Sequence, residues 1–236
     1  MLADLIIKRN LSLNKLREDL HLKKFKYDIK KYPLYDYLST LFGVTDLENI
    51  HEYLGHFDPF SREQDQYTIL HKVFYSNFRL PNSPLQKMYE ALIKDFIAPL
   101  VSEKFYYQKI PTFRIGLPQN KFVGEFHRDT AYNHQPFELN FNLAIANYKG
   151  SAALITEDKA GSKNLIPAEI DYGEVMGFDH IGCLHGSEKN QTGKTMMSMD
   201  FRLALADIYY EDPKAESVNL HSKFIIGDYF SAEVVN

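Results

Sequence analysis

Three residues of this sequence have the types and the spacing of a metal site: His127, Asp129 and, 56 residues further along, His185. Two imidazoles and one carboxylate can occupy one face of an ion and leave its other positions open. This is the 2-His-1-carboxylate arrangement of non-haem Fe(II) sites that react with oxygen. Thiolates would instead favour a closed zinc site. A His-x-Asp pair alone is a weak signal, because most such pairs are solvated surface residues.

The His-x-Asp pair follows an alternating stretch, residues 121–127, which predicts a strand. On a strand, residues i and i+2 point to the same side, so His127 and Asp129 can reach one ion. A helix would instead place ligands three or four residues apart.

The elements that must position these residues fall into two parts. Residues 1–107 are predicted to be mainly helical, and residues 108–208 to form short strands with Gly, Asn and Pro between them. Residues 209–236 are predicted to fold back over this core. The predicted helices are 2–24, 35–42, 46–54 and 85–100; the predicted strands are 112–117, 121–127, 138–145, 152–156, 173–178, 181–184 and 195–208. The fold class is therefore α+β, with a sandwich-like or closed β core in a single domain, 1–236.

Composition narrows the functional classes. The net charge of −4 argues against a general nucleic-acid binder. No apolar run reaches the ~18–20 residues that cross a bilayer, so no membrane partner is expected. The N-terminus does not resemble a signal peptide. The single cysteine, Cys183, excludes an internal disulfide and indicates a reducing compartment, the cytoplasm.

Several linked segments between residues 108 and 206 resemble one enzyme family. They are 111–115 (PTFRI), 125–134 (EFHRDTAYNH), 138–143 (ELNFNL), 185–187 (HGS) and 199–202 (MDFR). Together they resemble the streptomycin-biosynthesis-type branch of the Fe(II)/2-oxoglutarate-dependent oxygenases.

The resemblance implies a double-stranded β-helix (a cupin-like jelly roll) flanked by helices, with Fe(II) bound by His127, Asp129 and His185. It also implies that 2-oxoglutarate and O2 are cosubstrates, consumed to succinate and CO2 while a prime substrate is hydroxylated. The substrate is expected to be a small polar metabolite in a biosynthetic pathway. Related halogenases place a small residue where this chain has Asp129, so Asp129 indicates oxygenation.

A dicarboxylate cosubstrate needs a cation at its far end, and the planar fork of an arginine is well suited to that role. Arg202, on the last core strand, is the predicted anchor. Relatives often carry a further arginine where this chain has Met196, and Lys194 is the second choice. The structural alternative is a simple Arg202–acid pair.

Two more polar residues are candidates for binding the cosubstrate. Asn140 could contact its carboxylate, or could be a buried amide that satisfies backbone groups. Arg114 could bind a substrate or cosubstrate carboxylate, or could form a salt bridge with Glu125 or Glu138.

Tyr132 and His134 follow the His-x-Asp pair on a predicted rim loop, where substrate contacts are common. Surface exposure or packing would explain them equally well. His180 competes with His185 for the second histidine position; the His-Gly-Ser context favours His185.

Two other functional classes stay open. A cupin-like metal-dependent isomerase or epimerase would use the same barrel without oxygen, and fold alone cannot exclude it. A non-catalytic jelly-roll module that binds a small ligand would not need all three ligands. A nucleic-acid demethylase is disfavoured by the acidic balance of the chain.

Overall fold

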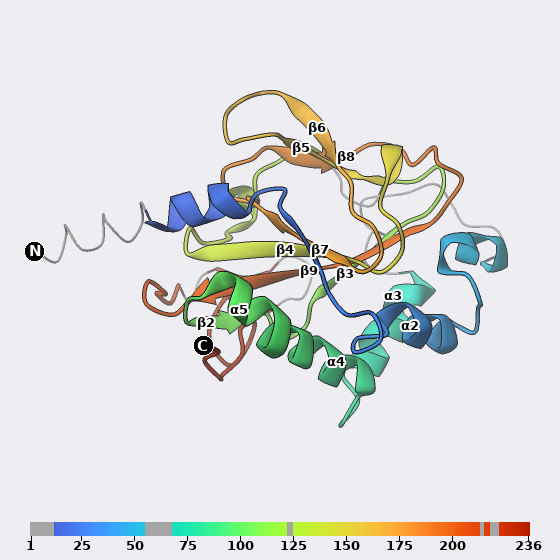
Figure 1. Ribbon diagram of the computed structural model, residues 1–236, viewed down its shortest axis with the longest axis horizontal. Helices are drawn as coiled ribbons and strands as arrows, with labels where there is room; N and C mark the ends of the chain where they lie inside the picture. Colours follow the sequence, from blue (N-terminus) through green and yellow to red (C-terminus); the bar gives the residue numbers. More distant parts are fainter. Residues whose placement is uncertain (1–11, 55–67, 122–124, 213–214, 218–221) are drawn as a thin grey trace, which may run out of the picture.

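The fold was analysed in a computed structural model, which describes residues 12–54, 68–121, 125–212, 215–217 and 222–236. A layer of helices, the larger antiparallel sheet and a smaller antiparallel sheet are stacked on one another (Figure 1). The helical elements are residues 12–20, α2 (Leu34–Phe42), the 3-10 helix η1 (Leu47–Tyr53), α3 (Ile69–Phe78), α4 (Pro84–Leu92), the π-helical turn η3 (Ile93–Ile97) and α5 (Ala98–Val101). Short 3-10 helices η4 (Asp129–Tyr132) and η5 (Gly150–Ala152) lie among the strands.

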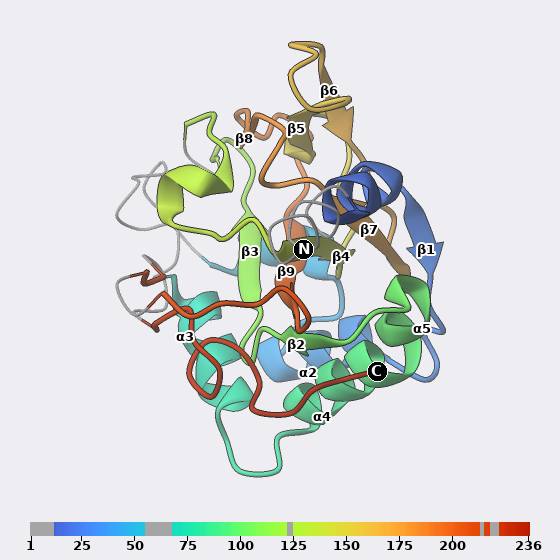
Figure 2. The same ribbon diagram turned by 90° about the vertical axis from the view of Figure 1, so that its left-hand side faces the viewer.

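The strands form two antiparallel sheets. They are β1 (Lys24–Lys26), β2 (Phe105–Tyr107), β3 (Thr112–Gly116), β4 (Glu138–Ala144), β5 (Leu154–Glu157), β6 (Leu165–Ala168), β7 (Glu174–Phe178), β8 (His185–Ser187) and β9 (Met196–Leu205). The larger sheet has the order β1-β7-β4-β9-β2, with β3 also paired to β9; the smaller sheet has the order β6-β5-β8. Helices α2 to α5 cover one face of the larger sheet, and the smaller sheet lies over the opposite face (Figures 1 and 2).

The predicted α+β class, with a helical first part and an antiparallel β part, is confirmed. The helix predicted over 85–100 is present as α4, η3 and α5. Ser83 caps its first turn by accepting a hydrogen bond from the Gln86 N–H at 3.3 Å, and Pro84 follows. The π turn precedes Pro99, which lacks the N–H that an α-helix requires.

Several short strands were missed or misplaced by the sequence analysis. Strands β1, β2 and β6 have three or four residues each, too few to show a periodicity. The strand predicted over 181–184 is wrong, because the pairing begins only at His185. Residues 2–11 of the first predicted helix, and 122–124 of the predicted strand 121–127, lie outside the described residues.

The main hydrophobic core lies between the helices and the larger sheet. The Phe74 ring of α3 stacks on the Phe113 ring of β3, with centroids 4.1 Å apart. Tyr89 of α4 meets Phe201 of β9 edge-on at 5.7 Å. The other face of β4 and β9 is also buried, because it faces the smaller sheet. Within the described parts of the chain, no helix is long and apolar enough to cross a bilayer.

His71, on α3, makes this core sensitive to acid. Its Nδ1 lies 2.7 Å from the Thr68 hydroxyl, and burial next to Phe113 lowers its pKa from 6.5 to about 4. The unfolded chain therefore binds more protons between those two pH values. We expect the free energy of unfolding to fall by up to about 3 kcal/mol as the pH drops from 6.5 to 4.

Chemical denaturation across this pH range measures the effect, with His71→Leu as the comparison. The variant should show a flatter dependence of its unfolding free energy on pH between 6.5 and 4. Parallel curves for the two proteins would exclude His71 as the source.

Candidate metal centre

The ligand atoms of His127, Asp129 and His185 all lie within 4.8 Å of one another. The backbones of His127 and His185 exchange two hydrogen bonds, of 2.8 and 2.9 Å, in a single antiparallel bridge. His127 is thus not on a regular strand as predicted, and Asp129 begins η4. Arg128 between them is nevertheless extended (φ −110°, ψ 145°), so the expected same-side relation of His127 and Asp129 is kept.

The two imidazoles point their Nε2 atoms at the same carboxylate oxygen. Nε2 of His127 lies 3.3 Å, and Nε2 of His185 3.1 Å, from Oδ1 of Asp129. The Nδ1–H groups donate to the carbonyls of Glu125 (2.8 Å) and Cys183 (3.0 Å). A carbonyl only accepts, so each neutral ring carries its proton on Nδ1 and offers the Nε2 lone pair to the centre. This donor set fits a divalent transition metal.

Arg202 holds the other oxygen of Asp129. Its Nη2 donates to Oδ2 at 2.7 Å, and both side chains are buried. Burial alone would raise the pKa of Asp129, but the charge of Arg202 beside it holds that pKa well below its usual range. Burial would lower the pKa of Arg202, and the anions around it raise it instead. The structural alternative of an Arg202–acid pair is therefore present, and the acid is Asp129.

A cavity of about 30 Å³ connects the triad to a second arginine. Arg114 and Asp200 line it together with the triad and Arg202, and Nε of Arg114 donates to Oδ2 of Asp200 at 2.9 Å. Asp200 is therefore a partner of Arg114, where the sequence analysis considered Glu125 and Glu138. The cavity has room for about two water molecules.

Asn140 lies in this cavity, directly opposite Arg202 in the β4–β9 pairing. Its Oδ1 and the Nε–H of Arg202 are both buried, and neither has a hydrogen-bond partner among the described residues. Asn140 is therefore placed where the sequence analysis expected a cosubstrate contact. For the alternative, a buried amide that satisfies backbone groups, the hydrogen bond found for Asn140 is instead to a side chain, from its Nδ2 to Oδ1 of Asn142 at 3.5 Å.

The second-choice anchor, Lys194, does not line the cavity. Its ammonium group donates to Oδ1 of Asn49 on η1 at 2.8 Å. Met196, where relatives often have arginine, is fully buried in the small apolar cluster between the sheets. Arg114 and Arg202 are thus the arginines of the cavity lining.

The two candidates from the predicted rim loop, Tyr132 and His134, contact different residues. The half-buried Tyr132 meets the His127 ring edge-on, with centroids 4.7 Å apart. His134 points away from the triad, because Asn133 adopts a left-handed conformation (φ 67°) that turns the chain. Its Nδ1 lies 2.7 Å from Oε2 of Glu138.

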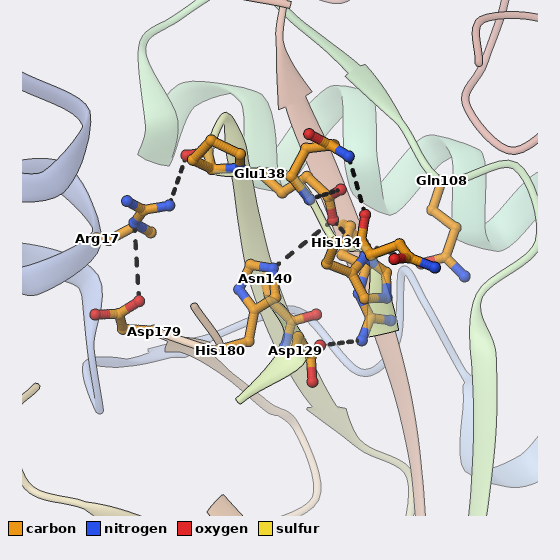
Figure 3. Close-up of polar contacts among 12 residues, drawn as sticks. Arg17, Gln108, Asp129, His134, Glu138, Asn140, Asp179 and His180 are labelled. Carbon is orange, nitrogen blue, oxygen red and sulfur yellow. Dashed lines mark hydrogen bonds and ion pairs between the residues drawn. The ribbon is translucent and has the colours of Figure 1, made fainter. Parts of the chain in front are cut away.

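His134, Glu138 and His180 form a second cluster, seen beside Asp129 in Figure 3. His180, the rival of His185, thus belongs to this cluster and not to the triad. Sequence reasoning considered Glu138 only as a partner for Arg114.

Sequence reasoning also missed Gln108, which is fully buried behind Arg202. Its Oε1 accepts the Arg202 backbone N–H at 3.2 Å, and its Nε2 donates to the Ile110 carbonyl at 2.7 Å. A single amide between two predicted elements carries no sequence signal for this role.

No family model matches the chain. Among solved structures, similarity extends to the non-heme monooxygenase ThoJ in its apo form and to AviO1 from Streptomyces viridochromogenes Tue57. The ThoJ match has 12% identity, 82% coverage of this chain, 76% coverage of ThoJ and a TM-score of 0.45. The AviO1 match has 12% identity, 85% and 94% coverage and a TM-score of 0.40. Both similarities are too distant to support an assignment.

The streptomycin biosynthesis protein StrG of Streptomyces griseus is much more similar. The two sequences are 30% identical over 207 residues, which are 88% of this chain and 96% of StrG. The chain therefore belongs to the family of the streptomycin biosynthesis protein StrG.

Proposed function

We propose that this protein is an Fe(II)- and 2-oxoglutarate-dependent dioxygenase that hydroxylates a small polar metabolite in a biosynthetic pathway. The observation that supports the proposal is that the Nε2 atoms of His127 and His185 both point at Oδ1 of Asp129. Their Nδ1–H groups donate hydrogen bonds to backbone carbonyls. Three ligands on one side leave positions for a chelating cosubstrate and O2. We further propose that the two sheets are the halves of a double-stranded β-helix, and that the enzyme works in the cytoplasm.

His127, Asp129 and His185 would hold the iron. Bound there, Fe(II) would supply the oxygen chemistry that inserts one O2 oxygen into a C–H bond and the other into succinate, as 2-oxoglutarate loses CO2. Arg202 keeps Asp129 ionised and fixes its Oδ2, which leaves Oδ1 directed at the metal position. Tyr132 lies against His127 at the rim, where it can contact a substrate.

For the distal carboxylate of 2-oxoglutarate we propose Arg114 in place of the expected Arg202. Arg202 is engaged with Asp129 at the metal end of the cavity. Arg114 pairs with Ser198, which lies four residues from Arg202 along β9, so the backbones of the two arginines are about 14 Å apart. Arg114 and the triad line the same cavity, so this arginine would meet a diacid that enters there.

Ser198 supports this choice. It lies directly across from Arg114, so both side chains are on the same face of the sheet. Its hydroxyl is buried and has no hydrogen-bond partner within the described chain. Arginine and hydroxyl together would hold a carboxylate, after the Arg114–Asp200 pair has opened to admit it.

An anaerobic titration tests the proposal. Fe(II) and then 2-oxoglutarate are added to metal-free protein, and the visible charge-transfer band of the chelate is followed. Arg114→Met is expected to raise the dissociation constant of 2-oxoglutarate about 10- to 150-fold, the equivalent of a charge-assisted hydrogen bond worth about 1.5–3 kcal/mol. Lys194→Met, outside the cavity, is the matched control and should not change it.

The outcomes separate the alternatives. If Arg202→Met weakens 2-oxoglutarate binding and Arg114→Met does not, the anchor is Arg202. If wild-type protein binds Fe(II) but gives no band with 2-oxoglutarate, the oxygenase proposal fails and a metal-dependent isomerase or epimerase is favoured. If it binds no metal, a non-catalytic binding module is favoured.

A further inference from the structure

The cluster of His134, Glu138 and His180 contains a buried carboxylate with an unusual set of partners. Among the described residues, three other carboxylates are almost fully buried in ion pairs, and each has an arginine within 3.7 Å: Asp129, Glu157 and Asp179. The ion-pair partners of Glu138 are two imidazoles. Burial alone would raise its pKa, but the two histidines lower it to about 2, so Glu138 is ionised at neutral pH.

One oxygen of Glu138 is directed at both imidazoles. Oε1 accepts the backbone N–H of Gln135 at 2.8 Å, which fixes the carboxylate. Oε2 lies 2.7 Å from Nδ1 of His134 and 3.7 Å from Nε2 of His180. The three ligand atoms all lie within 4.8 Å of one another.

His180 provides the second, independent observation. Its side chain is 0% exposed, and neither ring nitrogen has a hydrogen-bond partner within the part of the chain that the structure describes. An unsatisfied buried imidazole is costly, so a group that binds it would be strongly favoured. Burial lowers the pKa of His180, and the carboxylates of Glu138 and Asp129 offset this only in part.

We propose that His134, Glu138 and His180 bind a second divalent transition-metal ion, with Zn²⁺ as the best-suited candidate. Two imidazoles and one carboxylate are a known zinc ligand set, with a fourth position for water. At metal–ligand distances of 2.0–2.2 Å, tetrahedral ligands stand about 3.4 Å apart. The distance from Nδ1 of His134 to Oε2 of Glu138 would have to increase by about 0.7 Å. The distance from Nε2 of His180 to the same oxygen would have to decrease by about 0.3 Å.

The second ion would stabilise the backbone around Asp129, which is a ligand of the first ion. The Asp129 N–H donates to the His180 carbonyl at 2.9 Å, and the His134 N–H donates to the Asp129 carbonyl at 3.3 Å. A metal bridging His134 and His180 would therefore fix both ends of the backbone that presents Asp129. The proposal concerns metal binding alone and does not depend on the reaction at the triad.

Titration of metal-free protein with Co²⁺ under anaerobic conditions tests the proposal. Wild type should bind about two equivalents, one with the intense visible bands of a tetrahedral site. Glu138→Gln and His134→Gln should each lose the tetrahedral bands, weaken one site at least about tenfold and keep the other. His127→Gln is the matched control, and it should lose the other equivalent and keep the tetrahedral bands.

The opposite results are equally clear. Binding of one equivalent by wild type, lost entirely in His127→Gln, would overturn the proposal. Two equivalents retained in both His134→Gln and Glu138→Gln would do the same. If Glu138→Gln does not fold, His134→Gln decides, because that side chain lies at the edge of the cluster. Failure of the triad as a metal site would appear separately, as no change in His127→Gln.

Discussion

Asp129→Ala is expected to lose the bound metal and also about 3–5 kcal/mol of folding free energy. The metal is lost because Oδ1 of Asp129 is the point on which His127 and His185 converge. The stability is lost because Arg202 would stay buried without its 2.7 Å partner, and removing one member of a buried ion pair costs about that much. Metal analysis after reconstitution and urea denaturation measure the two losses separately.

A double variant distinguishes the two losses. Asp129→Ala/Arg202→Met removes both charges and should recover most of the stability while still failing to bind metal. His127→Ala should lose metal with a stability change within about 1 kcal/mol, since Nδ1 of His127 donates a single hydrogen bond, to the Glu125 carbonyl. Wild-type stability in Asp129→Ala would show that the ion pair does not stabilise the fold. A normal metal content would remove Asp129 from the ligand set.

The long elements of this fold could be predicted because their residues follow a period. Strands β3, β4 and β9 and the helix from Pro84 alternate or repeat over five or more residues. Strand β8 could not be predicted, since His185-Gly-Ser has no strand propensity and is held extended by its pairing with β5. In β4 the polar residues Glu138, Asn140 and Asn142 are buried, because that face lies under the second sheet.

The proposed metal site could be predicted in more detail than the residues around it. His127, Asp129 and His185 need only an extended dipeptide and one bridge, and the sequence carries both ligand types and their order. The position of the His134 side chain depends on the left-handed backbone conformation of Asn133. The partners of Arg114 and Arg202 depend on the register of β9, which no local pattern specifies.

Phe113→Ala is expected to destabilise the protein by about 3–5 kcal/mol, the range for removing a fully buried ring. Phe113 is 0% exposed and stacks on Phe74 with the ring planes 4° apart. This contact joins α3 to β3, so the cavity left by the ring would weaken the attachment of the helices to the larger sheet. Urea denaturation measures the loss.

Phe113→Ala should also affect the proposed 2-oxoglutarate site, because Phe113 and Arg114 are neighbours in the chain. Arg114 follows Phe113 on β3, so loosening β3 should also weaken binding of 2-oxoglutarate in the anaerobic titration. Ile69→Ala on α3 is the matched control: Ile69 is 60% exposed, and its truncation should change stability by no more than about 0.5 kcal/mol. If Phe113→Ala lowers the free energy of unfolding by less than about 1 kcal/mol, the Phe74–Phe113 stack does not join the two layers. Other contacts, such as the one between Tyr89 and Phe201, would then hold the helices on the sheet.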